Sequence, residues 1–234
     1  IDLSLSVDSA EKGGDPGTTV VYTVSLENTG SDPDDFSLEI VRCDDCSAWG
    51  VDLSTYEILD LEDGDVLNID VTAVLNEYYG DTSRMFIIGN SSIKAKNLID
   101  VTYKSMMKAI KILKPGKKLG NIVYEIQSYV EKKGFSVVRD FCGHGISTVF
   151  HEPPNILHYG KKNTGMEIKA GMTFTIEPMI NSGKYDVKLL NDGWTAVTKN
   201  KSLSAQFEHT KGITENGYEI FTESAKGYSK PPYL

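Results

Sequence analysis

The stretch GDVLNIDVTAVLNEYYGDTSRMF, residues 64–86, decides how the larger part of this chain folds. Apolar and polar residues alternate on both sides of residues 76–77, a pattern that predicts an antiparallel hairpin. A turn there places Asp81 opposite Thr72 and diagonal to Asp70, on one face and about 7 to 8 Å apart at the backbone. Two ionised carboxylates on a half-buried face need a compensating charge, such as a divalent metal ion. For the hairpin alone, a solvated face without function is the alternative.

The charge of the chain is unevenly distributed. Residues 1–60 hold fourteen acidic and two basic side chains, a net charge of -12, whereas residues 61–234 hold nineteen acidic and 22 basic ones, a net charge of +3. All four histidines and all six methionines lie in the second part. We therefore expect two domains, an acidic β-rich segment over 1–60 and a second domain over 61–234.

Composition also argues against several classes of partner. No basic patch is interleaved with aromatic residues, so we expect no nucleic acid. No apolar run approaches the roughly 20 residues that span a bilayer, so we expect no membrane span. The chain begins at Ile1 without a Met or a basic-then-apolar leader, which indicates a fragment, a processed product or an artificial chain. The oligomeric state is left open.

The three cysteines are too few for a disulfide scaffold. Cys43 and Cys46 form a C-x-x-C pair, which we interpret as structural or incidental; a local disulfide and half of a metal site are the alternatives. Two aspartates between the thiols raise rather than lower their pKa. We expect Cys142 to be a small buried side chain.

The acidic segment has the pattern of antiparallel strands with one solvated face. In TTVVYTVSLENTGSDPDDFSLEI, residues 18–40, apolar residues recur at every second position on both sides of a turn-rich stretch. Together with the following residues, to about 75, the segment resembles the immunoglobulin-like repeats of archaeal and bacterial surface proteins. That resemblance implies an all-β module that binds or spaces.

Two helices are predicted after the hairpin. The serines at 91–92 can cap a helix whose apolar residues recur from Ile99 to Leu113, and Pro115-Gly116 ends it. A second helix runs from about Leu119 to Lys133 and is closed by Gly134. From residue 135 the pattern returns to strands and loops. The fold class is therefore α+β, with two helices covering one face of a sheet.

Further metal-ligating side chains follow the hairpin. His144 lies between two glycines in CGHGI, Glu177 lies in the apolar stretch GMTFTIEPMI, and Glu208 lies in SLSAQFEHT. A Glu embedded in an apolar strand is seldom left unpaired. With Asp70 and Asp81 these residues form an oxygen-rich set that suits two ions such as Mn²⁺, Fe²⁺, Co²⁺ or Zn²⁺. Four carboxylates balance the charge of two dications.

These residues belong to an ordered series of motifs, GDVLNIDVTAVLNEYYGDTSRMF, GHGI, FHEPPNILHYG, GMTFTIEPMI and DGWTAVTKNKSLSAQFEHT. The series resembles type I bacterial methionine aminopeptidase over about residues 61–222. The resemblance implies a pita-bread half-fold and a dinuclear metal centre held by five ligands: Asp70, Asp81, His144, Glu177 and Glu208. It also implies that His151 contacts the scissile peptide, that Glu177 shuttles a proton, and that Phe150 and Trp194 line the pocket for Met.

The chain departs from the family pattern in three respects. The family's first half supplies another catalytic histidine, whereas the first histidine here is His144. Such a loss commonly costs about 10² to 10⁴-fold in rate. Ser147 replaces a glycine of GHGIG and adds a side chain beside the backbone. Lys211 replaces an apolar residue and places a charge in a strand that we expect to be half-buried, which destabilises it.

The resulting hypothesis is a hydrolase that removes Met from the N-terminus of peptides or nascent proteins in the cytoplasm, with activity impaired by the missing half. Its cofactors are two divalent metal ions. The alternative is a non-catalytic binding or spacer protein that carries a recombined or decaying peptidase segment. A creatinase-like or proline-specific peptidase is a third reading, against which SLSAQFEHT and Trp194 argue.

Overall fold

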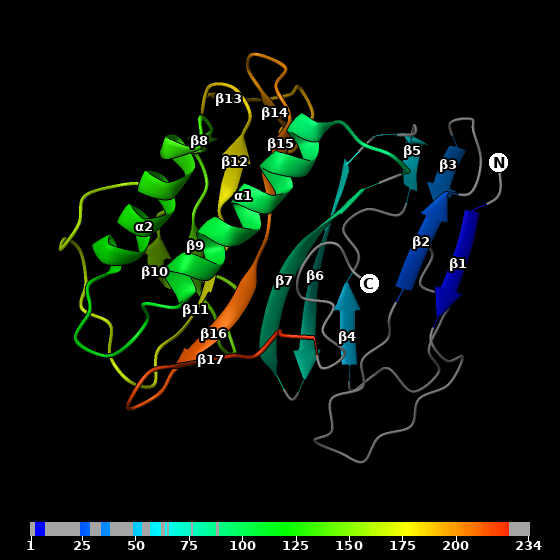
Figure 1. Ribbon diagram of the computed structural model, residues 1–234. Helices are drawn as coiled ribbons and strands as arrows, with labels where there is room; N and C mark the ends of the chain where they lie inside the picture. Colours follow the sequence, from blue (N-terminus) through cyan, green and yellow to red (C-terminus); the bar gives the residue numbers. More distant parts are fainter. Residues whose placement is uncertain are drawn as a thin grey trace. The chain divides into compact units, whose positions relative to one another are not determined.

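The computed structural model describes residues 3–7, 24–28, 34–37, 49–52, 57–61, 64, 66–75, 77–87 and 89–224 (Figure 1). Side chains are described for 64, 66–72, 77–87 and 89–224. The chain forms two compact units, one of Ile1–Glu39, Thr55–Leu67 and Ile87–Ser92, the other of Ile40–Ser54, Asn68–Phe86 and Ile93–Leu234. The domain boundary near residue 60 stays a prediction.

Antiparallel strand pairs form in the acidic segment. Strand β1 (Leu3–Val7) pairs with β2 (Val24–Asn28), and β3 (Asp34–Ser37) pairs with β5 (Glu57–Leu61). The strands predicted within residues 18–40 are thus confirmed at Val24–Asn28 and Asp34–Ser37, whereas the immunoglobulin-like fold stays a prediction. Cys43 and Cys46 lie outside the described residues.

The predicted hairpin is confirmed. Strand β6 (Val66–Leu75) is followed by β7 (Tyr78–Ile87), and Glu77 takes a positive φ of 68° in the turn between them. Strand β4 (Trp49–Asp52) pairs with β6 at its other edge, which gives a sheet in the order β4-β6-β7. The Thr72 hydroxyl donates to Asp81 Oδ1 at 2.8 Å, in agreement with the predicted register.

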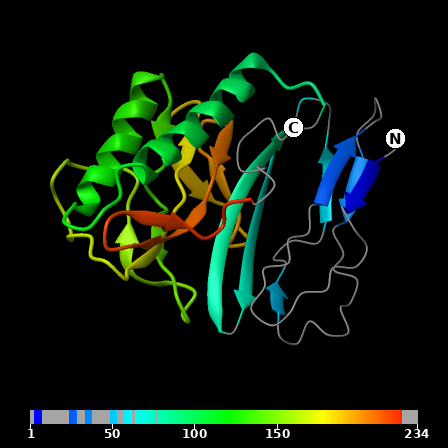
Figure 2. The ribbon, with the colours of Figure 1, turned by 60° about the horizontal axis from the view of Figure 1, so that its bottom comes forward.

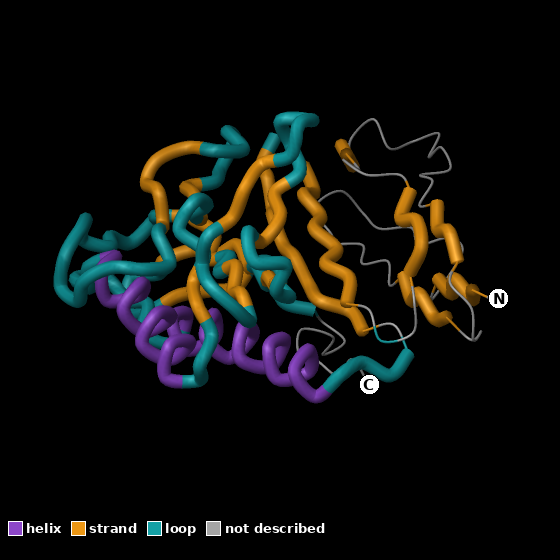
Figure 3. Tube along the Cα trace, turned by 90° about the horizontal axis from the view of Figure 1, so that it is seen from above, coloured by secondary structure: helices purple, strands orange, loops and turns teal. Residues whose placement is uncertain are grey.

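Both predicted helices are present. Helix α1 spans Ile93–Ile110 and begins directly after the serines at 91–92, and α2 spans Leu119–Lys132. Gly134 closes α2 with a φ of +81°. Leu113, expected in the first helix, lies three residues beyond its end but is buried. The helices lie on the same side of the strands of their unit, as Figure 3 shows.

The strands after α2 form short antiparallel sheets beside the helices (Figure 2). One sheet has the order β10-β9-β11-β16-β17, a second β15-β12-β8 and a third β13-β14. Contacts join α1 to β15 and β12 and join α2 to β8, so the second sheet carries the helix layer. The strands are β8 (Ser136–Val137), β9 (Gly143–Gly145), β10 (Glu152–Ile156), β11 (Thr173–Ile176), β12 (Met179–Asn181), β13 (Val187–Leu189), β14 (Ala196–Thr198), β15 (Ser204–Gln206), β16 (His209–Ile213) and β17 (Tyr218–Ile220).

Candidate metal centre

Hydrogen bonds hold β7 against the end of the chain that carries Glu208. The Asp81 N–H donates to the Thr210 hydroxyl at 2.8 Å, and this hydroxyl donates to the Asp81 carbonyl at 2.8 Å. The Glu208 N–H donates to the Ser83 carbonyl at 3.0 Å, and the Thr82 hydroxyl donates to the Glu208 carbonyl at 2.9 Å. Two segments more than 120 residues apart in the chain are therefore fixed side by side, with Asp81 near Glu208.

A compact group of ligand atoms results from this docking. One ligand atom each of Asp81, His144 and Glu208 lies within 4.8 Å of the other two, and all three residues are buried. His144 Nε2 lies 3.7 Å from Asp81 Oδ2 and 3.6 Å from Glu177 Oε1. We call the five predicted ligands, Asp70, Asp81, His144, Glu177 and Glu208, the carboxylate cluster.

The backbone around His144 sets the orientation of its ring. His144 Nδ1 lies 3.0 Å from the Gly145 carbonyl, so with Nδ1 as donor the lone pair of Nε2 is on the side of the carboxylates. The flanking glycines allow this backbone to run close to its neighbours. A Cβ at Gly145 would lie 2.4 Å from the Pro153 carbonyl, and one at Gly143 would lie 2.7 Å from the Thr175 carbonyl. The glycines thus make room for adjacent strands, and not only for a ligand as their positions in the sequence indicate.

Glu177 and Asp70 join the cluster from its margin. Glu177 directly follows β11, where the Thr175 hydroxyl donates to its Oε1 at 2.7 Å and the Gln206 amide to its Oε2 at 3.4 Å. Asp70 lies on β6 and is exposed, but it is near enough to interact electrostatically with Asp81, Glu177 and Glu208. The structure therefore gathers all five predicted ligands, with three in the tight group and two beside it.

Burial and mutual repulsion disfavour charge on these carboxyls. Desolvation is the largest cause at each, and it raises the pKa of Glu177 to about 7 and that of Asp70 to about 7, the latter with the charges of Asp81 and Glu177. Desolvation, followed by the charges of Glu177, Asp81 and Asp70, raises the pKa of Glu208 well above its usual value. Desolvation lowers the pKa of His144, but the carboxylates of Asp81 and Glu177 outweigh this effect and raise it.

The donor set fits a divalent cation. Glu208 is 1% exposed, and its buried Oε1 has no hydrogen-bond partner among the described residues. A buried carboxylate oxygen without a donor is costly, and a metal ion satisfies it. Oxygen ligands with one imidazole suit hard or borderline ions such as Mn²⁺, Fe²⁺, Co²⁺ or Zn²⁺.

Two of the three predicted substrate-binding residues lie beside the cluster. The rings of His151 and His144 have centroids 4.3 Å apart, and Phe150 stacks on Tyr79 with centroids 5.4 Å apart. Desolvation and the charge of His144 lower the pKa of His151, which favours its neutral form. Trp194 lies on the turn between β13 and β14 and is 80% exposed.

The departures from the family pattern have different outcomes. The Ser147 hydroxyl donates to Glu152 Oε1 at 2.5 Å, so the added side chain is accommodated. The expectation that the strand of Lys211 is half-buried is wrong, because all five residues of β16 are buried and Lys211 is 0% exposed. The Lys211 ammonium donates to the His209 carbonyl, and burial lowers its pKa well below the usual value. Cys142, expected to be buried, is half-buried.

Several residues of the site were missed by sequence reasoning. Thr175 and Thr210 support the cluster through their hydroxyls, and Tyr79 supports Phe150. The position of Thr175 two residues before Glu177, on the same face of an extended chain, is a signal that identifies it. The pairing of Tyr79 with Phe150, 71 residues later, has no local signal.

Comparisons with known proteins agree with the motifs. A methionine aminopeptidase of Rickettsia prowazekii is 59% identical over 174 residues, which are 74% of this chain and 67% of the relative. One of Escherichia coli is 51% identical over 162 residues, which are 69% of this chain and 61% of the relative. The crystal structure of methionine aminopeptidase from Rickettsia prowazekii aligns with a TM-score of 0.70 at 56% identity and covers 74% of this chain and 70% of that one.

The helix layer, the sheets and the buried acid–histidine group define the class of pita-bread hydrolases with mixed α and β structure. The model of metallopeptidase family M24 matches residues 39–215. The chain belongs to this family, for which divalent metal ions are implied. It spans about three fifths to two thirds of the length of its relatives. Within the described residues, no helix is long and apolar enough to cross a membrane.

Proposed function

We propose that this chain is a metalloaminopeptidase that removes Met from the N-terminus of peptides or nascent proteins. The observation that carries the proposal is the buried group of Asp81, His144 and Glu208, whose ligand atoms lie within 4.8 Å of one another. The similarity to methionine aminopeptidases over 74% of the chain supports the choice of substrate. We also propose a cytoplasmic location, as expected from these relatives.

The cluster would hold two divalent ions, Co, Mn, Fe or Zn, through Asp70, Asp81, His144, Glu177 and Glu208. Such ions, when bound, supply Lewis-acid activation of a water nucleophile at neutral pH. Charge balance supports two ions, because four carboxylates compensate two dications. Asp70, on β6, lies at the margin of this set and interacts electrostatically with Asp81 and Glu177.

The remaining roles belong to side chains at the margin of the cluster. Glu177 would accept a proton from the nucleophile and pass it to the leaving amine, and the Thr175 hydroxyl at 2.7 Å orients its carboxylate. His151 is exposed, and desolvation together with the charge of His144 lowers its pKa, which favours the neutral form that a hydrogen bond to the scissile peptide would use. Phe150, stacked on Tyr79, would provide an apolar wall for the Met side chain, and Trp194 would close that pocket from its exposed turn.

Metal binding and Met release, measured on one sample, test the proposal. The full chain is titrated with Mn²⁺ or Co²⁺ in a calorimeter, and release of Met from a tripeptide is followed by chromatography. We expect saturable binding of two ions and slow release of Met. Absence of saturable binding would overturn the metal centre, and bound metal without Met release would favour the non-catalytic alternative.

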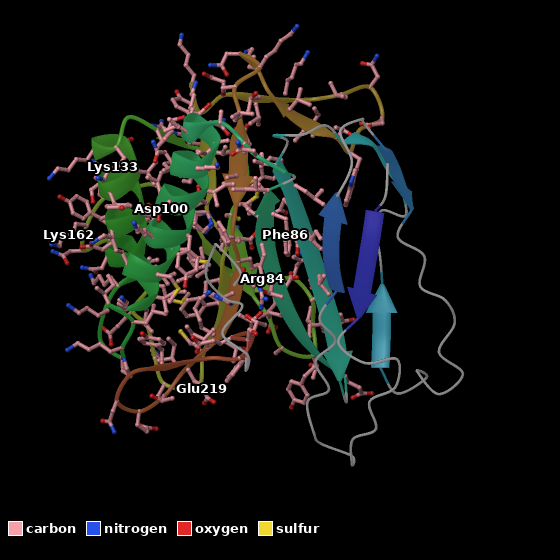
Figure 4. All side chains as sticks on the ribbon, turned by 45° about the vertical axis from the view of Figure 1, so that its right-hand side comes forward. Arg84, Phe86, Asp100, Lys133, Lys162 and Glu219 are labelled. Carbon is pink, nitrogen blue, oxygen red and sulfur yellow. The ribbon has the colours of Figure 1, made fainter. Side chains whose placement is uncertain are left out.

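A matched pair of aspartate variants separates the site from general effects of charge. Asp81→Asn removes a carboxylate of the cluster, and we expect it to lose metal binding and Met release. Asp100→Asn removes a carboxylate that is exposed on α1 and pairs with Lys104 at 2.7 Å (Figure 4). It should leave both properties unchanged.

A further inference from the structure

A polar cavity lies where α1 leads into α2. Its volume is about 460 Å³, within the range of roughly 300 to 1,000 Å³ that is usual for small-molecule sites. The lining residues are Lys114, Pro115, Gly116, Lys117, Lys118, Asn121 and Asn163. None of them belongs to the carboxylate cluster, so the cavity is a separate feature of the molecule.

The cavity carries positive charge without a counter-charge. Three of the lining side chains are lysines and none is acidic. Among the described residues, none of the ammoniums of Lys114, Lys117 and Lys118 takes part in an ion pair. Glu167 pairs with Lys118 through a backbone bridge, but it does not line the cavity. The charge of the lining therefore disfavours a cation as the ligand of this cavity and favours an anion.

The hydrogen-bonding groups that remain available in the lining are donors, which also favours an anion. Asn121 Oδ1 already accepts from the Lys118 N–H at 3.3 Å, and Asn163 Oδ1 accepts from the Asn121 amide at 2.8 Å. The Lys117 carbonyl accepts from the Ile168 N–H at 2.7 Å. These acceptors are engaged, so the amide nitrogen of Asn163 and the three ammoniums remain as donors for a ligand.

The start of α2 adds to the field but not to the hydrogen bonds. The N–H groups of Leu119 and Gly120 donate to the carbonyls of Met166 and Thr164, both at 2.9 Å. The helix dipole still favours negative charge at this end. Recognition of a ligand therefore depends on the lysines and on Asn163.

The wider surroundings attract anions to this cavity. Residues 93–169 hold fourteen basic and six acidic side chains, a net charge of +8, although the whole chain has a net charge of -9. A region of one sign raises the local concentration of ligands of opposite charge. The cavity therefore lies within the most strongly basic part of the described residues.

We propose that this cavity binds the phosphate group of a small molecule, as inorganic phosphate or a phosphomonoester. The three ammoniums would pair with the phosphate oxygens, and the Asn163 amide would donate one further hydrogen bond. The volume leaves room for the organic part of an ester. This site is independent of the proposed peptidase activity.

Calorimetric titration of the full chain with inorganic phosphate, and separately with glycerol 3-phosphate, tests the site. Sodium chloride keeps the ionic strength constant. We expect saturable binding of phosphate that Lys117→Gln and Asn163→Ala each weaken at least tenfold, with unchanged melting temperatures. Binding of both probes would identify an ester site, whereas binding of phosphate alone would identify a site for the free anion.

Lys162→Gln is the matched control. Lys162 is on the neighbouring loop (Figure 4). Its ammonium lies over the Tyr124 ring, 5.3 Å from the centroid, and it does not line the cavity. Loss of affinity equal to that of Lys117→Gln would overturn the proposal, because it would indicate non-specific attraction. Binding that disappears only in His144→Ala would assign the phosphate to the metal centre and also overturn it.

Discussion

The two faces of β16 bury ionisable groups in opposite ways. On one face, Thr210 and Glu208, the residue directly before the strand, meet Asp81 of the carboxylate cluster. On the other face, His209 and Lys211 pair with Ile176 and Phe174 of β11, both of which are fully buried. Alternation along an extended strand separates the two sets.

The difference between the faces lies in what compensates each charge. The carboxylate face can bind dications, so its repulsion disappears when metal is present. The ammonium of Lys211 donates to the His209 carbonyl, and burial lowers its pKa well below the usual value. Burial of the carboxylates on one face therefore favours metal binding. Burial of the Lys211 ammonium on the other face costs stability.

A pair of histidine variants gives the largest expected effect. His144→Ala removes an imidazole of the cluster, and we expect loss of metal binding and a decrease of Met release by about 10²-fold or more. His209→Ala removes a ring that contacts Thr222 Oγ1 at 2.9 Å on the opposite face. It should lower the unfolding free energy but leave the affinity for metal unchanged, as calorimetry on both variants would reveal. Equal losses of metal affinity would mean that the faces do not act separately.

Lys211→Met tests the cost of the buried ammonium. An apolar side chain of similar volume removes the buried charge and its desolvation cost, and we expect an increase in the free energy of unfolding. Urea denaturation measures this gain, and Lys94→Met, an exposed position on α1, is the control. A loss of stability would contradict the comparison, because it would make Lys211 a necessary counter-charge for Glu208 and Glu177, with which it interacts electrostatically.

The pH dependence of the metal-free protein tests the carboxylate face. The pKa of Glu177 is raised from 4.5 to about 7, so the stability from its protonated form is present below pH 4.5 and is lost as the pH rises through 7. A bound metal ion needs ionised carboxylates as ligands. It therefore offsets the stability that the metal-free protein loses when Glu177 ionises. The increase in melting temperature on adding Mn²⁺ should therefore grow from pH 5 to pH 7.5.

The pKa values of the core histidines are shifted in the opposite direction, so these residues serve as an internal check. Burial lowers the pKa of His158 and of His209 to about 3, so their contribution is lost as the pH falls below 6.5. The contribution of these histidines to stability is the same with and without metal. It therefore cancels in the metal-induced increase of the melting temperature. A metal-induced increase that does not change with pH would contradict the raised pKa of Glu177.

Local patterns predicted the elements of the larger unit well. Alternation and turn residues located the hairpin, and apolar spacing with a serine cap and Gly134 located both helices. The register of the hairpin also predicted the position of Thr72 opposite Asp81, which the 2.8 Å hydrogen bond confirms. These features depend on residues close together in the chain, so the residue types in each stretch were enough to predict them.

Long-range contacts could not be predicted in the same way. The docking of Asp81 on Thr210 depends on packing between segments 129 residues apart, which neither segment encodes alone. The full burial of Lys211 was missed for the same reason, because it depends on the neighbours of β16. Residue types and flanking patterns picked out the five candidate ligands, and the resemblance to a family implied their common role. The 80% exposure of Trp194 also depends on the turn that carries it, which the motif does not describe.

Ser147→Gly is expected to have the smallest effect and completes the comparison of departures from the family pattern. Unlike Lys211, Ser147 is half-buried, and its hydroxyl has found a charged acceptor, Glu152 Oε1. Loss of this hydrogen bond and the greater freedom of glycine should lower the unfolding free energy by about 1 kcal/mol. Urea denaturation beside Lys211→Met measures both changes, and Ser128→Gly would be an unsuitable control because it lies within α2. A gain in stability on Ser147→Gly would mean that both departures strain the fold, and that an available acceptor does not decide whether a new polar side chain is tolerated.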